Sequence, residues 1–156
     1  MRIFLDSSAY AQRFVEENGS AMVAAFCEDA SELGFSILCL PEIMSALHRL
    51  VRAGTIDRRE YALLRRYILA DMRDADIVHL TSEVIREALR VIEHSPVGAV
   101  HALPVACAIL WDADLFVSAD RRQLLAAKRA GLSVRSVEES ASHNVYIKPR
   151  NIPPST

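Results

Sequence analysis

The sequence has no apolar run long enough to cross a membrane. No segment approaches the roughly 18 apolar residues of a bilayer-spanning helix, and Arg2 and Asp6 place charges at the start of the chain, where a secretory leader would be apolar. We therefore expect a cytoplasmic protein that has no membrane partner.

Cysteines are also few, and the sequence has no glycine-rich loop motif. The three cysteines, Cys27, Cys39 and Cys107, are an odd number without CxxC spacing, which argues against a zinc knuckle and a disulfide framework. We expect them to be buried, reduced thiols. The absence of a Walker A or GxGxxG loop counts against a nucleotide-binding domain.

Glycine and proline are few, with 5 and 6 residues among 156. With 51% hydrophobic and 24% charged residues, this composition is typical of a folded globular protein and not of a disordered or fibrous one. The length suits one domain. The net charge of -2 does not exclude nucleic acid as a partner, because a local basic patch can coexist with it.

Short apolar segments alternate with amphipathic ones along the chain, and there is no tight-turn signal for a hairpin. This order predicts an α/β domain over residues 1–137 with a five-stranded, mainly parallel sheet flanked by helices, followed by a C-terminal tail at 138–156. The expected strands are 2–5, 35–40, 77–80, 115–118 and 132–137. The expected helices are 9–16, 20–30, 41–53, 58–73, 82–94, 101–111 and 120–130.

Local signals refine three of these helices. Asp57 and Glu60 have the spacing of a capping box, Pro104 is expected in the first turn of its helix, and Ser82 is expected to be an N-cap. The apolar residues expected to face the core from the helix after Ser82 are Val84, Ile85, Ala88, Leu89 and Ile92.

Three acidic residues follow three of the expected strands. Asp6 follows the first, Glu42 the second and Asp120 the fourth. The carboxyl ends of parallel strands line the crevice where α/β sheets bind ligands. Three carboxylates there would repel one another without a cation, and their oxygens suit Mg²⁺ or Mn²⁺. Such a site favours hydrolysis of a phosphodiester by metal-activated water.

Each acid also has a simpler interpretation. Asp6 and Asp120 precede helices and could be ordinary N-caps, and Glu42 in a first turn could complement the helix dipole. Capping does not require an acid at three strand ends, however, since Ser7, Ser8 and Ser118 could serve as caps instead. The three acids together therefore favour a metal site.

Three segments resemble the motifs of the PIN domain family, and within it the VapC-type toxins of prokaryotic toxin-antitoxin pairs. FLDSSA at 4–9 is close to the family's LDTSAL opening, PEIMSALHR at 41–49 to its second acidic motif, and ADLFVSADRR at 113–122 to its last. The resemblance covers roughly residues 2–137, in the family's order.

The resemblance implies a fold, an activity and roles for individual residues. The fold would be a PIN-like domain, and the activity that of a Mg²⁺- or Mn²⁺-dependent ribonuclease that cleaves single-stranded or loop RNA. The partners would be a cognate antitoxin and a second copy in a homodimer. Asp6, Glu42 and Asp120 would be catalytic metal ligands, with Ser8 orienting Asp6 and Ser118 supporting the site.

One segment departs from the family pattern. Where family members have an aspartate in a motif like DALHLATA, this chain reads HALPVACA, so that His101 stands in its place. Three interpretations remain open: a substituted metal ligand that shifts the metal preference, a general acid or base, or a change that leaves a PIN fold with little activity.

Several arginines lie on helices expected to start at, or run from, the crevice. Arg121 and Arg122, next to Asp120, are the favoured RNA contacts, with Arg49 and Arg13 as further candidates. The simpler alternative is that these residues form solvated helix faces.

The leading hypothesis is therefore a metal-dependent endoribonuclease toxin. Its main alternative is a PIN-fold module with weak or no catalysis that binds RNA or a protein. A third is a phosphate-binding or phosphohydrolase α/β domain. RNA cleavage by the natural chain, compared with Asp6→Ala and His101→Asp, separates the first two.

Overall fold

A five-stranded parallel sheet forms the centre of the molecule. The computed structural model describes residues 1–14 and 18–137, so the expected tail at 138–156 lies outside the described residues. The strand order is β3-β2-β1-β4-β5, and all four pairings are parallel. The strands are β1 (Arg2–Leu5), β2 (Glu32–Ser36), β3 (Asp76–Val78), β4 (Leu115–Ser118) and β5 (Val134–Ser136). The predicted α/β class and parallel sheet are confirmed.

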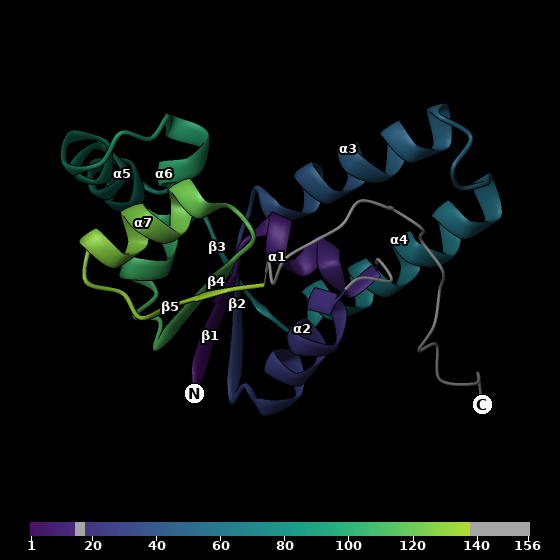
Figure 1. Ribbon diagram of the computed structural model, residues 1–156, viewed down its shortest axis with the longest axis horizontal. Helices are drawn as coiled ribbons and strands as arrows, with labels where there is room; N and C mark the ends of the chain where they lie inside the picture. Colours follow the sequence, from purple (N-terminus) through teal and green to yellow (C-terminus); the bar gives the residue numbers. More distant parts are fainter. Residues whose placement is uncertain (15–17, 138–156) are drawn as a thin grey trace.

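Helices cover both faces of this sheet (Figure 1). They are α1 (Ser7–Ala11), the 3-10 turn η1 (Gln12–Phe14), α2 (Asn18–Asp29), α3 (Cys39–Arg52), α4 (Arg58–Arg73), α5 (Ser82–His94), α6 (Ala99–Leu110) and α7 (Arg121–Arg129). The first group, α1 to α4, lies on one face and α5 to α7 on the other. None of the helices in the described ranges has the length and apolarity that crossing a bilayer requires.

The central strand contributes to two hydrophobic cores. Side chains alternate between the two faces of a strand, so Ile3 and Leu5 pack in the core with α1 to α4, while Phe4 packs in the core with α5 to α7. All three are fully buried. Burial of each contributes roughly 1.5–3 kcal/mol, which fixes the position of the chain just before Asp6.

The predicted capping box at the start of α4 is confirmed. The Asp57 carboxylate accepts hydrogen bonds from the backbone N–H groups of Arg59 (2.7 Å) and Glu60 (2.8 Å), and Glu60 accepts one from the N–H of Asp57 (2.8 Å). The first backbone N–H groups of a helix have no carbonyl partner within it. Here the capping box bonds two of them, those of Arg59 and Glu60, and also the N–H of the cap residue Asp57. The helix spans 58–73, as predicted.

The apolar run at 35–40 is not one strand, which corrects the sequence prediction. Strand β2 ends at Ser36 and helix α3 begins at Cys39. The Ser36 hydroxyl accepts a hydrogen bond from the N–H of Leu38 (3.2 Å), so the chain turns immediately after the strand. Pro41 then falls in the first turn of α3, where a missing N–H costs no helical hydrogen bond.

Pro104 lies deeper in its helix than predicted. Helix α6 begins at Ala99, so Pro104 is its sixth residue and lies in the second turn. At this position a proline cannot donate to the carbonyl of Val100. The expected start at residue 101 was therefore wrong by two residues.

Helix α5 buries a narrower stripe than predicted. Its N-cap is Thr81, whose hydroxyl accepts from the N–H of Val84 (3.3 Å), and not Ser82. Ile85 and Leu89, both expected to face the core, are exposed at 43% and 54%. The buried residues are Val84, Ala88 and Val91.

The first two helices also differ from their predicted bounds. The helix expected at 9–16 begins earlier, at Ser7, and gives way to η1 after Ala11. Residues 15–17 lie outside the described residues. The next helix begins at Asn18 and not at Ser20.

Candidate functional site

The carboxyl ends of β1 and β4 lie at the topological switch point of the sheet, where the connections after these two strands run to opposite sides. β1 lies between β2 and β4, and the chain order extends the sheet to β3 on one side and to β5 on the other. In open α/β sheets, ligands bind in the crevice outside the strand ends at this point. Asp6 follows β1 and Asp120 follows β4, and the N–H of Asp6 donates to the carbonyl of Val117 on β4 (3.1 Å).

Asp6 is a buried carboxylate at this crevice, with 2% of its surface exposed. Its Oδ1 accepts from the N–H of Ala9 (2.9 Å), and both its oxygens lie within hydrogen-bond distance of Ser8 Oγ (2.9 and 2.8 Å). Burial raises the pKa of Asp6, and the hydrogen bonds from Ala9 and Ser8 oppose this effect without cancelling it. The charged form of Asp6 is therefore less favoured than that of an exposed aspartate, and a nearby cation would favour it.

Ser8 connects Asp6 to the turn after β4. Its hydroxyl accepts from the N–H of Ala119 (3.0 Å) and lies 3.4 Å from the hydroxyl of Ser118. Ser118 is fully buried, and its hydroxyl accepts from the N–H of Asp120 (2.9 Å). A chain of hydroxyl groups thus links the two strand ends and holds the backbone at Asp120. The predicted supporting positions of Ser8 and Ser118 fit this network.

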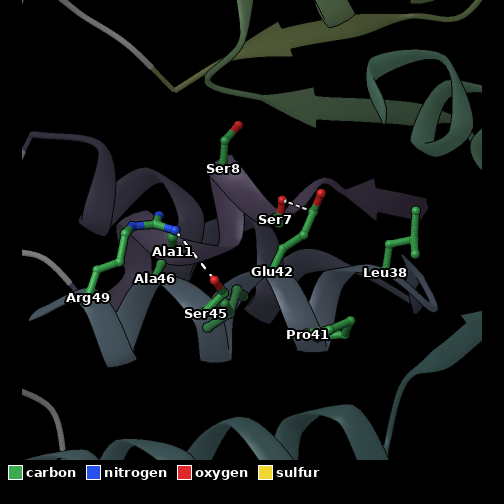
Figure 2. A pocket seen from close by; sticks show the side chains of 10 residues that line it. Ser7, Ser8, Ala11, Leu38, Pro41, Glu42, Ser45, Ala46 and Arg49 are labelled. Atoms are coloured by element: carbon green, nitrogen blue, oxygen red, sulfur yellow. Dashed lines mark hydrogen bonds between the residues drawn. The ribbon is translucent and has the colours of Figure 1, made fainter. Parts of the chain in front are cut away.

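Glu42 approaches the same region from the first turn of α3. Its carboxylate accepts a short hydrogen bond from the hydroxyl of Ser7 on α1. Figure 2 shows Ser7 and Glu42 pointing toward each other, whereas Ser8 points away from this pair. Ser7 therefore contacts the acid that follows β2, whereas Ser8 contacts Asp6 after β1 and the turn after β4.

A pocket of about 590 Å³ lies between α1 and α3, lined by Ser7, Ser8, Ala11, Leu38, Pro41, Glu42, Ile43, Ser45, Ala46 and Arg49. Glu42 and Arg49 lie two turns apart on α3, so that the pocket carries an acid toward one end and a guanidinium toward the other (Figure 2). Arg49 is exposed and lies 3.5 Å from the hydroxyl of Ser45. A phosphate could contact Arg49 here.

Asp120 is engaged by positive and polar partners. Its Oδ1 accepts from the N–H of Arg122 (2.8 Å), and the Arg122 guanidinium contacts Oδ1 (3.3 Å) and Oδ2 (3.0 Å). His101 Nε2 lies 3.1 Å from Oδ2. Burial alone would raise the pKa of Asp120, but the hydrogen bonds and charge of Arg122 outweigh it and hold this pKa below its ordinary value.

The capping interpretation of two acids holds alongside the site. Asp6 caps α1 through the N–H of Ala9, and Asp120 caps α7 through that of Arg122. Each cap uses Oδ1. Because a carboxylate has two oxygens with several acceptor positions, capping leaves Asp6 free to bind another group.

The remaining basic candidates lie in different surroundings. Arg121 is exposed at the first position of α7. Arg13 forms an ion pair with Asp71 on α4, and the hydroxyl of Tyr10 also donates to Asp71 (2.6 Å). Sequence reasoning missed this cluster and the Ser7–Glu42 contact, because nothing local marks pairs that are 61, 58 and 35 residues apart. RNA binding by Arg13 stays a prediction.

The donor chemistry fits a hard divalent cation at Asp6 and Glu42. Burial raises the pKa of Asp6, and the groups that oppose this rise are the hydrogen-bond donors Ala9, Ser8 and Ser118; a nearby cation would further favour the ionised form. Within residues 1–14 and 18–137, however, no group of three His, Cys, Asp or Glu side chains is arranged so that it could hold a metal ion. Asp120 is engaged by Arg122, and the roles of Asp120 and His101 as ligands stay predictions.

Comparisons with known proteins agree with this architecture. Similar solved structures include PAE2754 from Pyrobaculum aerophilum (18% identity, TM-score 0.63, 88% of this chain and 84% of that chain). VapBC2 from Rickettsia felis, bound to a DNA fragment from its promoter, has 10% identity and a TM-score of 0.62 over 87% and 98%. VapC20 from Mycobacterium tuberculosis, described as a Sarcin-Ricin loop cleaving toxin, has 16% identity and a TM-score of 0.60 over 83% and 95%.

At these identities the similarity is one of fold. Comparison with curated protein sequences gave no match. The sequence profile of the PIN domain, in contrast, matches residues 3–129, which include all three acidic motifs. The chain belongs to the PIN domain family.

Proposed function

We propose that this protein is a metal-dependent endoribonuclease, the toxin of a toxin-antitoxin pair, that cleaves single-stranded or loop RNA. The observation that carries the proposal is the buried carboxylate of Asp6 at the switch point of the sheet, where burial raises its pKa and hydrogen bonds, rather than a cation, oppose that rise. Membership of the PIN family, whose domains are generally nucleases, supports the reaction class.

In this mechanism, Asp6 and Glu42 would hold Mg²⁺ or Mn²⁺, and Asp120 would be a further ligand. When bound, the ion lowers the pKa of water and offsets negative charge on the transferring phosphoryl group. Ser8 keeps the Asp6 carboxylate in place through its hydroxyl (2.9 and 2.8 Å). Ser7 does the same for Glu42.

The basic residues around the crevice position the RNA backbone. Arg121 and Arg122 begin α7 beside Asp120, and Arg49 lies at the pocket between α1 and α3. Guanidinium groups bind phosphates through charge-assisted hydrogen bonds that carry no sequence information. We expect these arginines to determine affinity for RNA, whereas surface shape selects the target.

The partners of the proposal are a cognate antitoxin and a second copy of the chain. VapBC2 from Rickettsia felis and a toxin-antitoxin complex from Klebsiella pneumoniae are among the similar structures. Co-expression with the product of a neighbouring small reading frame tests the first partner, and light scattering of the purified chain tests the second. We expect a cytoplasmic location for such a protein.

A PIN-fold module with weak or no catalysis is the second candidate. The contacts of Asp120 with Arg122 and His101 favour it, because they occupy one of the three predicted ligands. The test is cleavage of a structured RNA in Mg²⁺ and then Mn²⁺ by the natural chain, Asp6→Ala and His101→Asp. Cleavage by the natural chain but not by Asp6→Ala supports the nuclease; cleavage only by His101→Asp supports the module.

A further inference from the structure

The guanidinium of Arg122 lies on the carboxylate of Asp120 as a two-point contact. Its Nη2 is 3.0 Å from Oδ2 and its Nε is 3.3 Å from Oδ1, while the backbone N–H of Arg122 donates to Oδ1 at 2.8 Å. Both oxygens of Asp120 are therefore engaged by one residue. A planar guanidinium matches a carboxylate in this way better than any other side chain.

His101 closes this pair from a second helix. Its Nε2 is 2.9 Å from Arg122 Nη2 and 3.1 Å from Asp120 Oδ2. One nitrogen cannot accept a hydrogen bond from Arg122 and donate one to Asp120 at the same time. In the neutral form with the proton on Nδ1, Nε2 accepts from Arg122, and the lone pair that could bind a metal is directed at the guanidinium.

The accessibility of the three side chains distinguishes them. The Asp120 and His101 side chains are only 19% and 24% exposed, whereas that of Arg122 is 66% exposed. Arg122 can thus leave toward solvent while its two partners remain in place. The raised pKa of Arg122 and the lowered pKa of Asp120, each with the other as a cause, agree with a pair in which both members are charged.

We propose that Arg122 is an internal cation that occupies Asp120 in the metal-free protein, held there by His101, and that a divalent cation must displace it to recruit Asp120 as a ligand. This inference rests on the proposed metal-dependent nuclease function. The guanidinium and the divalent cation repel each other and compete for the same oxygens. The site therefore binds metal more weakly than its carboxylates alone would.

Mn²⁺ affinity without RNA tests this competition. Free Mn²⁺ is measured by electron paramagnetic resonance at fixed ionic strength for the natural chain, for Arg122→Met, and for Arg129→Met as a matched control. Methionine keeps an apolar stem and removes the charge. Arg129 lies in the last turn of the same helix. We expect Arg122→Met to bind Mn²⁺ about tenfold more tightly and Arg129→Met to bind within about twofold of the natural chain.

A second measurement follows Arg122 in the natural chain. Its Nε–Hε resonance, identified by its loss in Arg122→Met, should shift on addition of Mg²⁺ as the guanidinium leaves Asp120. Equal Mn²⁺ affinities of the natural chain and Arg122→Met overturn the proposal, as do a resonance that does not move at saturating Mg²⁺ and a lack of Mn²⁺ binding by both chains.

Parallel RNA cleavage assays keep this test separate from that of the proposed function. If Arg122→Met binds Mn²⁺ more tightly but none of the chains cleaves RNA, the internal cation stands and the nuclease activity fails. If the natural chain cleaves RNA and the affinities are equal, the nuclease stands and the internal cation is wrong.

Discussion

The polar residues at the two ends of the parallel sheet differ in their charge partners and in their burial. At the amino end, the Arg2 guanidinium lies 4.4 Å from the centre of the Trp111 ring and forms an ion pair with Glu32 (3.2 Å). The indole N–H of Trp111 donates to Asp76 (3.0 Å). At the carboxyl end, Asp6 is buried, and this burial raises its pKa. The contacts at the amino end stabilise the fold without any ligand. The buried carboxylate at the carboxyl end lowers the free energy of unfolding, and a bound cation would offset that loss.

Burial accounts for this difference. The charged side chains at the amino end are partly exposed, Arg2 at 33% and Glu32 at 52%, so both water and the opposite charge stabilise them. Asp6 is 2% exposed, so a large part of its hydration is lost on folding. Residues that lower the stability of the free protein are those expected at functional sites, and the following substitutions test whether this assignment of the two ends is right.

The largest expected effect comes from Asp6→Asn. Removing the charge while keeping the size should lower RNA cleavage at least about 100-fold, because the asparagine is a weak ligand for a hard cation. The matched control is Asp76→Asn at the amino end, whose amide oxygen can still accept from Trp111 and which should retain full activity. Initial cleavage rates in Mg²⁺ provide the measurement. Full activity of Asp6→Asn would remove Asp6 from the mechanism.

The same variant should not lose stability at neutral pH. The folded-state pKa of Asp6 is raised, so its contribution to stability is fully present below the unfolded pKa and is lost as the pH rises through the folded pKa. The amide that replaces the carboxyl group in the Asp6→Asn variant does not ionise, so the variant does not lose this stability as the pH rises. Urea unfolding in EDTA should show the stability of the variant relative to the natural chain increasing from acid to neutral pH; a difference independent of pH would contradict the role of burial.

Both ends of the sheet were only partly predictable from the sequence. Strand 115–118 and helix 58–73 match the predictions because short-range signals determine them: an apolar run after a turn, and a capping box. The positions of Asp6 and Asp120 at strand ends followed from the same local pattern. Sequence reasoning thus located the candidate ligands, although it did not determine their partners.

Contacts between distant segments were beyond that reasoning. The exposure of Ile85 and Leu89 depends on which face of α5 meets α6, and periodicity alone cannot fix that choice. Trp111 contacts Arg2, Phe4 and Asp76, which are far from it in the sequence, and no motif links these positions. Arg122 was expected to bind RNA, yet nothing local indicated that its guanidinium would also meet His101, 21 residues away.

The largest loss of stability should come from Trp111→Ala at the amino end. The indole packs beside Phe4, with ring centroids 6.0 Å apart, and against Gly34. Its removal should cost about 3 kcal/mol in the free energy of unfolding and leave the cleavage rate per folded molecule unchanged. Urea unfolding should be followed by circular dichroism, because Trp111 is the only tryptophan of the sequence and its removal abolishes tryptophan fluorescence. A lower rate in the fully folded variant would mean that the two ends are coupled.

Gly34→Ala should have a smaller effect on the same cluster. A Cβ at this position would lie 2.9 Å from two atoms of the Trp111 ring and 3.0 Å from Phe4. This overpacking should cost about 2 kcal/mol. In a Trp111→Leu background the ring is gone, so the added cost should fall below about 1 kcal/mol. Additive effects of the two substitutions in thermal unfolding would show that the ring does not limit position 34.

Arg2→Met should have the smallest effect and sharpens the contrast with Arg122. The Arg2 ion pair and its cation–π contact are partly exposed, so their loss should cost about 0.5–1 kcal/mol, decreasing between low and high salt as the charges are screened. Mn²⁺ affinity should not change, because Arg2 lies at the far end of the sheet. Arg122→Met should do the reverse, raising Mn²⁺ affinity while leaving the stability nearly unchanged. If both variants altered Mn²⁺ affinity equally, net charge and not position would govern metal binding, and the two ends of the sheet would not differ in function.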